Sequence, residues 1–275
     1  SIQEGKRSRS QDSAQHHSFQ SVNPMDNQSS APCLVCDGTG WKAIETEGVR
    51  SVVRCDCFEH ARLDKLFARA GVPPRYESCS FESFNGLTER LRAAKAILIK
   101  FVEEYPVAGC GLLILGPCGV GKTHLAVAVL RALVYCREVE GIFYDFRELL
   151  RRIQNSYNAV SQGSEMEILK PVLESPVLVL DDLGAERPTE WVRDTFAYIL
   201  NSRYNRKLTT IITTNFEDRV REPRSLGDGM RLSAEETLEE RIGVRLRSRL
   251  HEMCKVIQLE GDDFRAKVKQ AQFQV

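Results

Sequence analysis

The stretch that decides the fold is LLILGPCGVGKTHLA, residues 112–126. A short apolar run, typical of a buried strand, leads into glycines, and a helical pattern follows them. The glycine-rich part fits the pattern GxxxxGK[ST], whose backbone amides wrap closely around phosphate oxygens. Because strand, loop and helix follow in this order, the stretch predicts an α/β protein that binds a nucleotide through its phosphates.

Each position of this loop has an expected task. We expect Lys122 to reach the β- and γ-phosphates and the Thr123 hydroxyl to ligate Mg²⁺. The start of the helix adds the positive end of its dipole. Cys118 fits better as a small filler than as a nucleophile. A plain glycine turn is the alternative reading. The predicted nucleotide contacts are Gly116, Gly119, Val120, Gly121, Lys122, Thr123 and His124.

A second apolar run ends in two acidic residues. In PVLVLDDLGAE, residues 176–186, Asp181 and Asp182 follow a predicted buried strand. Ligands bind at the carboxyl ends of strands in open α/β sheets. We expect Asp181 to hold Mg²⁺ through water and Asp182 to orient the attacking water. Glu186 is a weaker candidate four residues later, and an ordinary acidic turn is the alternative.

A third apolar run ends in an amide. TTIITTNF, residues 209–216, predicts another buried strand that ends at Asn215. A side chain there can reach the γ-phosphate or the attacking water, as the sensor of an oligomerising ATPase does. Asparagine at a strand end is also a common turn residue. Beside the two preceding motifs, the sensor role is favoured.

Arginines repeat every four residues near the carboxyl-terminal end of the chain. Arg241, Arg245 and Arg249 share one face of a helix predicted over 234–253. In a ring ATPase, an arginine from one subunit stabilises the charge that develops on its neighbour's γ-phosphate. We expect Arg249 to be this finger, followed by Arg245 and Arg241. A solvated basic stripe is the alternative.

Four cysteines form two close pairs near the amino-terminal end. Cys33 and Cys36 are two residues apart, and Cys55 and Cys57 follow eighteen residues later. Four soft ligands in two pairs suit tetrahedral Zn²⁺, and the stretch between them can form a hairpin that joins the pairs. Such a closed site would be structural rather than catalytic. The alternatives are unligated core thiols and, less favoured, a redox CxxC.

Bulk composition excludes several classes. Lysine plus arginine and aspartate plus glutamate are equal at 38 each, and residues 241–275 carry a net charge of +4. That excess suggests an anionic partner or a solvated helix face. No apolar run approaches the ~20 residues of a membrane span. Nine cysteines without secretory features favour reduced thiols, so we expect a cytoplasmic protein.

Alternation of apolar runs and helical patterns predicts a parallel sheet with helices on both faces. Strands are expected at 111–115, 142–144, 177–180, 209–214 and 256–259, and helices at 60–70, 88–105, 122–136, 146–157, 191–204 and 234–253. The predicted domains are a disordered tail (1–31), a zinc lobe (32–75), a linker and helix (76–106), an ATPase domain (107–265) and a second tail (266–275).

Taken together, these motifs resemble the DnaC/DnaI/IstB group of AAA+ ATPases, most closely the bacterial DnaC type with an amino-terminal zinc lobe. The matching stretches are CLVCDGTGW, RCDC, GVPPRYESCSFESF, GPCGVGKTHLA, LVLDDLGAE, NSRYNRKLTTIITTN, RLRSRLHEMC and LEGDDFR. The resemblance implies an AAA+ core without the helical lid that many relatives carry.

It also implies an ATP-dependent loader or remodeller of a replicative DNA helicase. Such proteins bind the helicase through the amino-terminal lobe, oligomerise on ATP and engage single-stranded DNA. Similarity places DNA contacts on residues 146–157, at Arg147, Arg151, Arg152 and Tyr157. Asp182 stands where some members have glutamate, so slow hydrolysis, regulated by DNA or a partner, is expected.

Three rival functions fit parts of the pattern. An IstB-like transposition helper shares the ATPase core but usually begins near it, without a zinc lobe. A non-catalytic zinc adaptor would use the ATPase fold only as a nucleotide-gated scaffold. A small-molecule kinase is disfavoured by the arginine helix, the amide at the strand end and the missing lid.

Overall fold

The computed structural model describes residues 33–46, 48–106, 110–157, 164–219 and 237–266. The chain forms two compact units, Ser1–Cys57 and Phe58–Val275. The tail expected at 1–31 lies outside the described residues, and so does all but the first residue of the tail at 266–275. The domain limits drawn from the sequence stay a prediction.

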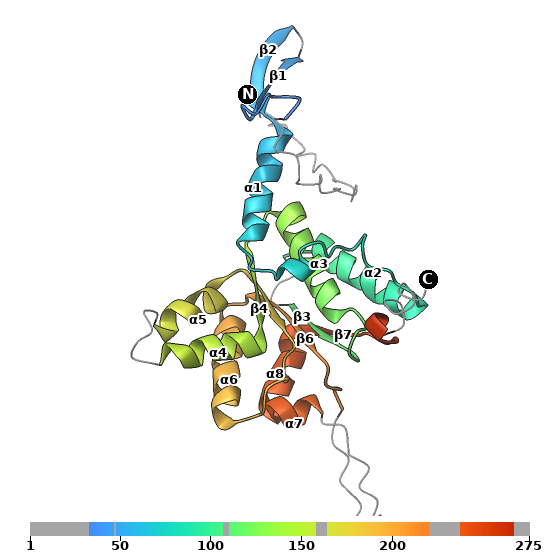
Figure 1. Ribbon diagram of the computed structural model, residues 1–275, viewed down its shortest axis with the longest axis vertical. Helices are drawn as coiled ribbons and strands as arrows, with labels where there is room; N and C mark the ends of the chain where they lie inside the picture. Colours follow the sequence, from blue (N-terminus) through green and yellow to red (C-terminus); the bar gives the residue numbers. More distant parts are fainter. Residues whose placement is uncertain (1–32, 47, 107–109, 158–163, 220–236, 267–275) are drawn as a thin grey trace, which may run out of the picture. The chain divides into compact units, whose positions relative to one another are not determined.

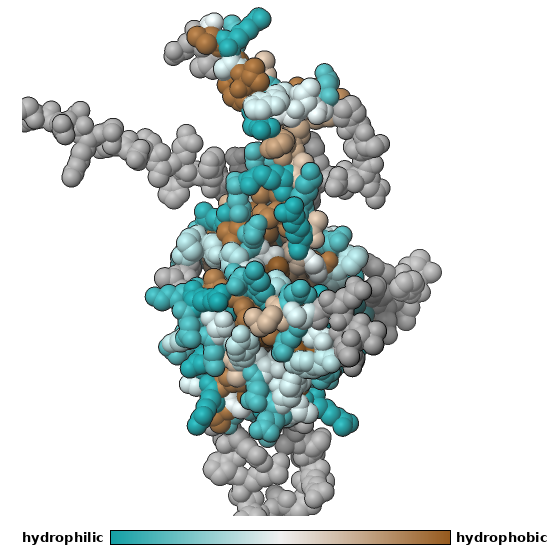
Figure 2. Space-filling view, turned by 90° about the vertical axis from the view of Figure 1, so that its left-hand side faces the viewer, coloured by the Kyte–Doolittle hydropathy of each residue, from teal (hydrophilic) through white to brown (hydrophobic). Residues whose placement is uncertain are grey.

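The amino-terminal unit contains the predicted hairpin. Strands β1 (Trp41–Thr46) and β2 (Val49–Arg54) pair antiparallel, with Trp41 opposite Arg54. Gly48, at φ +79°, adopts the left-handed conformation that the tight turn requires. Hydrophobic side chains of this unit lie at its surface (Figure 2), so little apolar core supports it; the exposed ones include Leu34, Val35, Trp41, Val49 and Val52.

The carboxyl-terminal unit is built on a five-stranded sheet in which every neighbouring pair is parallel. Its strand order is β4-β5-β6-β3-β7. The strands are β3 (Gly111–Leu115), β4 (Gly141–Asp145), β5 (Val177–Asp181), β6 (Thr209–Thr214) and β7 (Cys254–Gln258). The predicted parallel α/β sheet is confirmed.

Helices cover both faces of this sheet (Figure 1). Alternate residues of β3 enter opposite cores, because successive side chains of a strand point to opposite faces: Leu112 and Ile114 join one core, Leu113 and Leu115 the other. The first core holds residues of α1 (Asp56–Ala68), α2 (Glu89–Glu103) and α3 (Lys122–Arg137); the second holds residues of α4 (Phe146–Ser156), α5 (Glu165–Glu174), α6 (Glu190–Asn205), α7 (Leu238–Ile242) and α8 (Val244–Met253).

Two helical regions differ clearly from the sequence prediction. No element was predicted where helix α5 lies, because its Pro171 is a residue that usually breaks helices. The single helix expected over 234–253 is wrong, because Gly243 at φ +87° separates α7 from α8. Residues 234–236 lie outside the described part. Among the described helices, none combines the length and apolarity needed to cross a membrane.

Candidate nucleotide-binding site

The predicted site residues meet at one edge of the sheet. The phosphate-binding loop (residues 116–123) directly follows β3. Asp181 ends β5 and Asp182 comes next, and Asn215 directly follows β6. These strands are neighbours in the order β5-β6-β3, and all run parallel. The three motifs therefore lie at the carboxyl edge of the sheet, where open α/β folds bind ligands.

The loop has the backbone that a phosphate cradle requires. Gly119 and Gly121 adopt φ of +75° and +105°, which L side chains rarely adopt. A Cβ on Gly121 would lie 2.7 Å from the Phe84 ring. Lys122 is buried, and its Nζ donates to the Pro117 carbonyl at 2.7 Å. Burial lowers the pKa of Lys122, and the carboxylates of Asp181 and Asp182 oppose this effect.

Two hydroxyls hold Asp181. Thr123 Oγ1 donates to its carboxylate at 3.0 and 3.1 Å, and Thr213 Oγ1 donates at 2.6 Å. Burial raises the pKa of Asp181, while both threonine hydrogen bonds lower it. The predicted Mg²⁺ ligands, Thr123 and Asp181, are therefore in direct contact. Their oxygens are the hard donors that Mg²⁺ prefers.

Asp182 and Asn215 are joined by a hydrogen bond. Asn215 Nδ2 donates to Asp182 Oδ1 at 2.6 Å, and the Asp182 amide donates to Thr213 Oγ1 at 2.9 Å. Asp182 adopts φ +57°, an uncommon backbone conformation for a residue with a side chain. Burial raises its pKa, Asp145 raises it further, and Lys122 opposes both. The geometry thus fixes one oxygen of this carboxylate.

The remaining predicted contacts divide between backbone and packing roles. Val120 is buried. His124 points away from the loop: its Nε2 lies 2.9 Å from the Ser80 carbonyl and 3.1 Å from Ser83 Oγ. Phe84 packs edge-on against the His124 ring at a centroid distance of 5.4 Å. Burial lowers the pKa of His124, which favours the neutral ring.

The three candidate finger arginines have different surroundings. Arg249 donates to Asn201 Oδ1 and lies over the Tyr204 ring. Arg241 donates to the Glu186 carbonyl at 3.2 Å. The Arg245 side chain is exposed and makes no ion pair or hydrogen bond with the other described residues. Because Gly243 interrupts the helix, Arg241 does not continue the stripe of Arg245 and Arg249.

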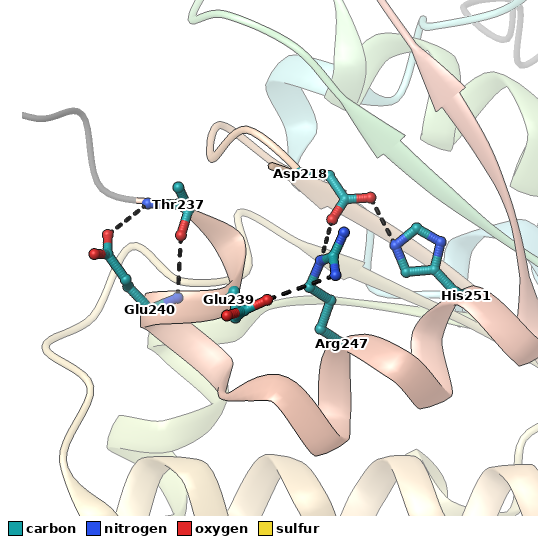
Figure 3. Close-up of polar contacts among 6 residues, drawn as sticks. All are labelled: Asp218, Thr237, Glu239, Glu240, Arg247 and His251. Atoms are coloured by element: carbon teal, nitrogen blue, oxygen red, sulfur yellow. Dashed lines mark hydrogen bonds and ion pairs between the residues drawn. The ribbon is translucent and has the colours of Figure 1, made fainter. Parts of the chain in front are cut away.

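A polar cluster fixes α8 beside the strand-end segment that follows Asn215 (Figure 3). Asp218 accepts from Arg247 Nε and lies 2.7 Å from His251 Nε2. Arg247 also lies 3.5 Å from Glu239. The Arg247 guanidinium therefore binds acidic residues of its own chain. Arg247 lies between Arg245 and Arg249 in the sequence of α8, so its contacts help to fix the helix that carries both.

Three of the four predicted DNA-contacting residues at α4 already contact other residues of this chain. Arg147 donates to the Ala185 carbonyl at 2.9 Å and lies 3.5 Å from Glu186, in the loop after the acidic pair. The Arg152 guanidinium lies over the Tyr144 ring. Tyr157 is half-exposed, and its hydroxyl donates to Glu165 at 2.9 Å. Arg151 is exposed.

In the amino-terminal unit, the four cysteine sulfurs converge. Sγ of Cys33 lies 3.9 Å from that of Cys55, and Sγ of Cys36 lies 3.4 Å from that of Cys57. All four lie within 4.8 Å of one another. Four sulfurs around a tetrahedral Zn²⁺, with bonds of about 2.3 Å, lie about 3.8 Å apart. The described residues contain no other group of three or more potential metal ligands this close together.

Backbone donors favour the charged form of one of these thiols. The Gly40 amide donates to Cys36 Sγ at 3.3 Å. Burial raises the pKa of Cys36, but hydrogen bonds, led by the one from Cys57 and including that from Gly40, lower it to about 7. A thiolate is the form that ligates metal. The cluster could therefore hold a metal ion such as zinc.

Several residues at the nucleotide site escaped the sequence reasoning. Thr213 contacts both acidic residues, and its position two residues before Asn215 in a polar strand end is the signal that could have found it. Phe84 and Asp263 come from distant parts of the chain. Asp263 lies against Gly119, where an added Cβ would be 1.8 Å from its Oδ1. No spacing in the sequence predicts that contact.

Comparison with known proteins identifies the family. The model of the IstB-like ATP binding proteins matches residues 62–272. The chain belongs to this family. The matched region of this IstB-like chain contains the whole sheet and the nucleotide site, and it begins after the four cysteines.

Several relatives of this IstB-like protein are helicase loaders. The replicative helicase loader DnaI of Bacillus subtilis (strain 168) is 31% identical over 168 residues, 60% of this chain and 51% of DnaI. The replicative helicase loader DnaC of Escherichia coli (strain K12) is 24% identical, over 64% of this chain and 73% of DnaC. The chain thus spans about half the length of DnaI.

Solved structures agree with this relationship. The crystal structure of the DnaC helicase loader has a TM-score of 0.56 and 35% sequence identity to this chain. The likeness covers 68% of this chain and 100% of that chain. The expected AAA+ core is therefore confirmed.

Proposed function

We propose that the chain is an ATP-dependent loader of a replicative DNA helicase. The observation that carries this proposal is the assembled nucleotide site, with Thr123 on Asp181 and Asn215 on Asp182, in a chain whose relatives are named helicase loaders. The family is named for ATP binding. Because the proposed partner works on the chromosome, the proposal implies a cytoplasmic protein.

The residues at the sheet edge have distinct roles in this proposal. Lys122 leaves the Pro117 carbonyl and binds the β- and γ-phosphates. Thr123 and Asp181 hold Mg²⁺, which neutralises charge on the phosphate oxygens when it is bound. Asp182, held by Asn215, orients the attacking water. Asp182 is one methylene shorter than the glutamate that some members of the group have. We therefore expect slow hydrolysis that DNA or a partner regulates.

The cysteine cluster has a structural role in the proposal. Cys33, Cys36, Cys55 and Cys57 bind Zn²⁺, and the metal supplies folding energy that the exposed hairpin lacks. The amino-terminal unit is then the part that contacts the helicase. Four thiolates leave no open coordination position, so the site performs no chemistry.

Oligomerisation and DNA binding complete the proposed cycle. ATP promotes contact between copies, and an arginine of α8 reaches the neighbour's γ-phosphate. Arg249, the favoured finger, would first leave Asn201, whereas the exposed Arg245 needs no such step. Single-stranded DNA would meet α4, where Arg151 is exposed and Tyr157 half-exposed.

A second candidate is an IstB-like transposition helper, which the family match itself favours. That match begins at residue 62, so it does not include the cysteine unit on which the loader proposal relies. A third candidate, a non-catalytic nucleotide-gated adaptor, differs from both in having no ATP turnover.

Turnover separates the adaptor from the two ATPases. We expect the full-length chain to hydrolyse ATP slowly, with a change in rate on adding single-stranded DNA or the helicase. Lys122→Ala should abolish ATP binding, because the buried ammonium is lost from the phosphate site. Lys255→Ala, at an exposed lysine of β7, is the matched control and should leave binding unchanged. Wild-type protein that binds ATP but never turns it over would support the adaptor instead.

Partner capture separates the loader from the transposition helper. The immobilised replicative helicase of the same organism should retain the full-length wild-type chain, and retention should fall when Cys55→Ser removes a zinc ligand. Capture by a transposase with no retention on the helicase would contradict the loader proposal and favour the second candidate.

A further inference from the structure

Helix α7 is attached to the segment that carries Asn215. The first backbone amide of this helix donates to the Glu217 carbonyl at 2.9 Å, two residues after Asn215. Thr237 and Glu240 close the first turn of the helix with two reciprocal hydrogen bonds, which Figure 3 shows. The position of α7, and of Arg241 in its last turn, is therefore tied to the end of β6.

Arg241 contacts both the segment that follows β6 and the loop that follows β5. Its guanidinium lies over the Phe216 ring, with Cζ 4.5 Å from the ring centroid. Its Nη1 donates to the Glu186 carbonyl at 3.2 Å. Phe216 directly follows Asn215, and Glu186 comes four residues after Asp182. One side chain thus spans the two segments that carry the hydrogen-bonded pair of Asp182 and Asn215.

The loop after β5 has a backbone that lets these contacts form. Gly184 adopts φ +89°. A Cβ added there would lie 2.9 Å from two carbons of the Phe216 ring and 3.5 Å from Arg241 Cβ. Before this glycine, the Leu183 amide donates to the Thr213 carbonyl at 2.8 Å. The start of the loop is thus fixed by β6, and Arg241 fixes its far part.

Arg241 is directed toward its own chain. Its Nε is shielded from solvent, whereas the Arg245 side chain is exposed. Arg193 of α6 donates to the Glu240 carbonyl at 3.0 Å and so fixes the helix end next to Arg241. An arginine that reaches a neighbouring subunit has to project from the surface. The contacts of Arg241 therefore favour a task within the same chain over a finger in the neighbour's site.

We propose that Arg241 is a positioning residue that holds Asp182 and Asn215 together at the nucleotide site of its own chain. This inference rests on the proposed ATPase function, and it gives one of the three candidate finger residues a different task. The hydrogen bond from Asn215 Nδ2 to Asp182 Oδ1, at 2.6 Å, orients the carboxylate that faces the attacking water. Loss of that orientation slows turnover without weakening ATP binding, since Arg241 contacts the segments beside the pair and not the phosphate-binding loop.

The first test measures kcat and the Kd of a fluorescent ATP analogue, with Mg²⁺, for full-length variants. We expect Arg241→Ala to lower kcat about tenfold and to leave the Kd within about twofold of wild type. In an Asn215→Ala background, the same substitution should change kcat by less than about twofold, because the pair that it positions is already lost. Arg187→Ala, at an exposed arginine of the same loop, is the control and should keep the wild-type kcat.

Two results of this test would overturn the inference while leaving ATP turnover by the chain intact. One is an undiminished loss of kcat when Arg241→Ala is added to Asn215→Ala protein. The other is a rise in Kd as large as the fall in kcat. Wild-type protein that never turns ATP over would instead overturn the proposed ATPase function and this inference together.

The second test separates a same-chain role from a finger. Arg241→Ala protein is mixed with Lys122→Ala protein, which keeps Arg241 but lacks the phosphate-binding lysine. A finger would pass from the Lys122→Ala subunit to its neighbour and restore turnover, so recovery would contradict the inference. We expect no recovery, whereas Arg249→Ala in the same mixture should recover as the control for assembly.

The double variant keeps the inference testable if the control mixture shows no recovery, because it needs no mixed oligomer. Thermal melting identifies a variant that fails to fold. In that case Arg241→Lys, which keeps a cation beside the Phe216 ring but lacks the planar fork, replaces Arg241→Ala in both tests.

Discussion

Asp181, the proposed Mg²⁺ ligand, carries a cost to stability. The fold buries this carboxylate, and two threonine hydroxyls only partly replace its water. Burial raises its pKa, which means that the folded state holds the charged form less favourably than the unfolded state does. At neutral pH this lowers the free energy of unfolding, and the penalty is lost as the pH falls through the raised pKa toward the ordinary value of an aspartate.

Asp181→Asn should therefore stabilise the nucleotide-free protein at neutral pH. We expect its Tm to exceed that of wild type by a few degrees, since 1 kcal/mol shifts Tm by about 2–4 °C in a domain of this size. The difference should shrink as the pH falls. With ATP and Mg²⁺ present, the order should reverse, because only wild type gains the binding free energy. Differential scanning calorimetry checks both effects, with exposed Asp194→Asn as the control.

A pattern of residue types predicted much of the site at this scale. Glycines, Lys122, Thr123, Asp181, Asp182 and Asn215 stand at the ends of recognisable strands, so their convergence follows from a parallel sheet. The contacts of Thr213, Phe84 and Asp263 do not follow in this way. They depend on which side chain a strand end or a distant loop turns toward the site, and sequence spacing carries no such information.

At the scale of elements, a buried arginine joins three parts of the second core. Arg203 of α6 is fully buried; its guanidinium donates to the carbonyls of Val172 and Ser175, at the end of α5, and to Thr209 and Thr210 of β6. Burial lowers its pKa to about 9. These hydrogen bonds offset the cost of desolvating the charge and satisfy carbonyls that a helix end leaves unpaired.

Arg203→Met should destabilise the protein by roughly 3 kcal/mol, because the buried carbonyls of Val172 and Thr209 and the part-buried carbonyl of Ser175 lose their donors. Arg206→Met is the matched control, since Arg206 is an exposed residue next to the same helix end whose pairing with Glu174 contributes little. Urea unfolding of the two variants measures the difference. Equal midpoints for Arg203→Met and wild type would show that the guanidinium does not hold α5 to the sheet.

The sequence predicted element boundaries well where the apolar periodicity was regular. It predicted them poorly where a single proline or glycine obscured or interrupted the helical pattern. Helix α2 begins and ends close to its predicted limits, because Thr88 caps it and its apolar face is regular. Helix α5 was not predicted, since Pro171 hides its pattern, and the break at Gly243 interrupts a pattern that reads as continuous. In both cases packing against the second core overrides the local signal.

At the scale of the whole molecule, the chain separates into two compact units with different sources of stability. The larger unit buries two apolar cores on either side of its sheet. The smaller one has an exposed hairpin and four convergent sulfurs, so a metal is its proposed source of folding energy. Loss of the metal should then lower the stability of the smaller unit and leave that of the larger unit unchanged.

Cys55→Ser should abolish binding of one equivalent of zinc and loosen the amino-terminal unit, while ATP binding stays at the wild-type level. Cys136→Ser, at an exposed cysteine outside the cluster, is the control and should retain the metal. Elemental analysis gives the zinc content, and limited proteolysis reports on the unit. Full zinc content in Cys55→Ser would contradict a four-cysteine site.

The most direct test of the central claim is helicase loading onto a closed circle of single-stranded DNA. The quantity measured is the amount of the organism's own replicative helicase that co-elutes with the circle on gel filtration. We predict that wild-type protein with ATP raises this amount well above that of helicase alone, and that Lys122→Ala does not. An equal amount of helicase on the circle with and without wild-type protein would contradict the account.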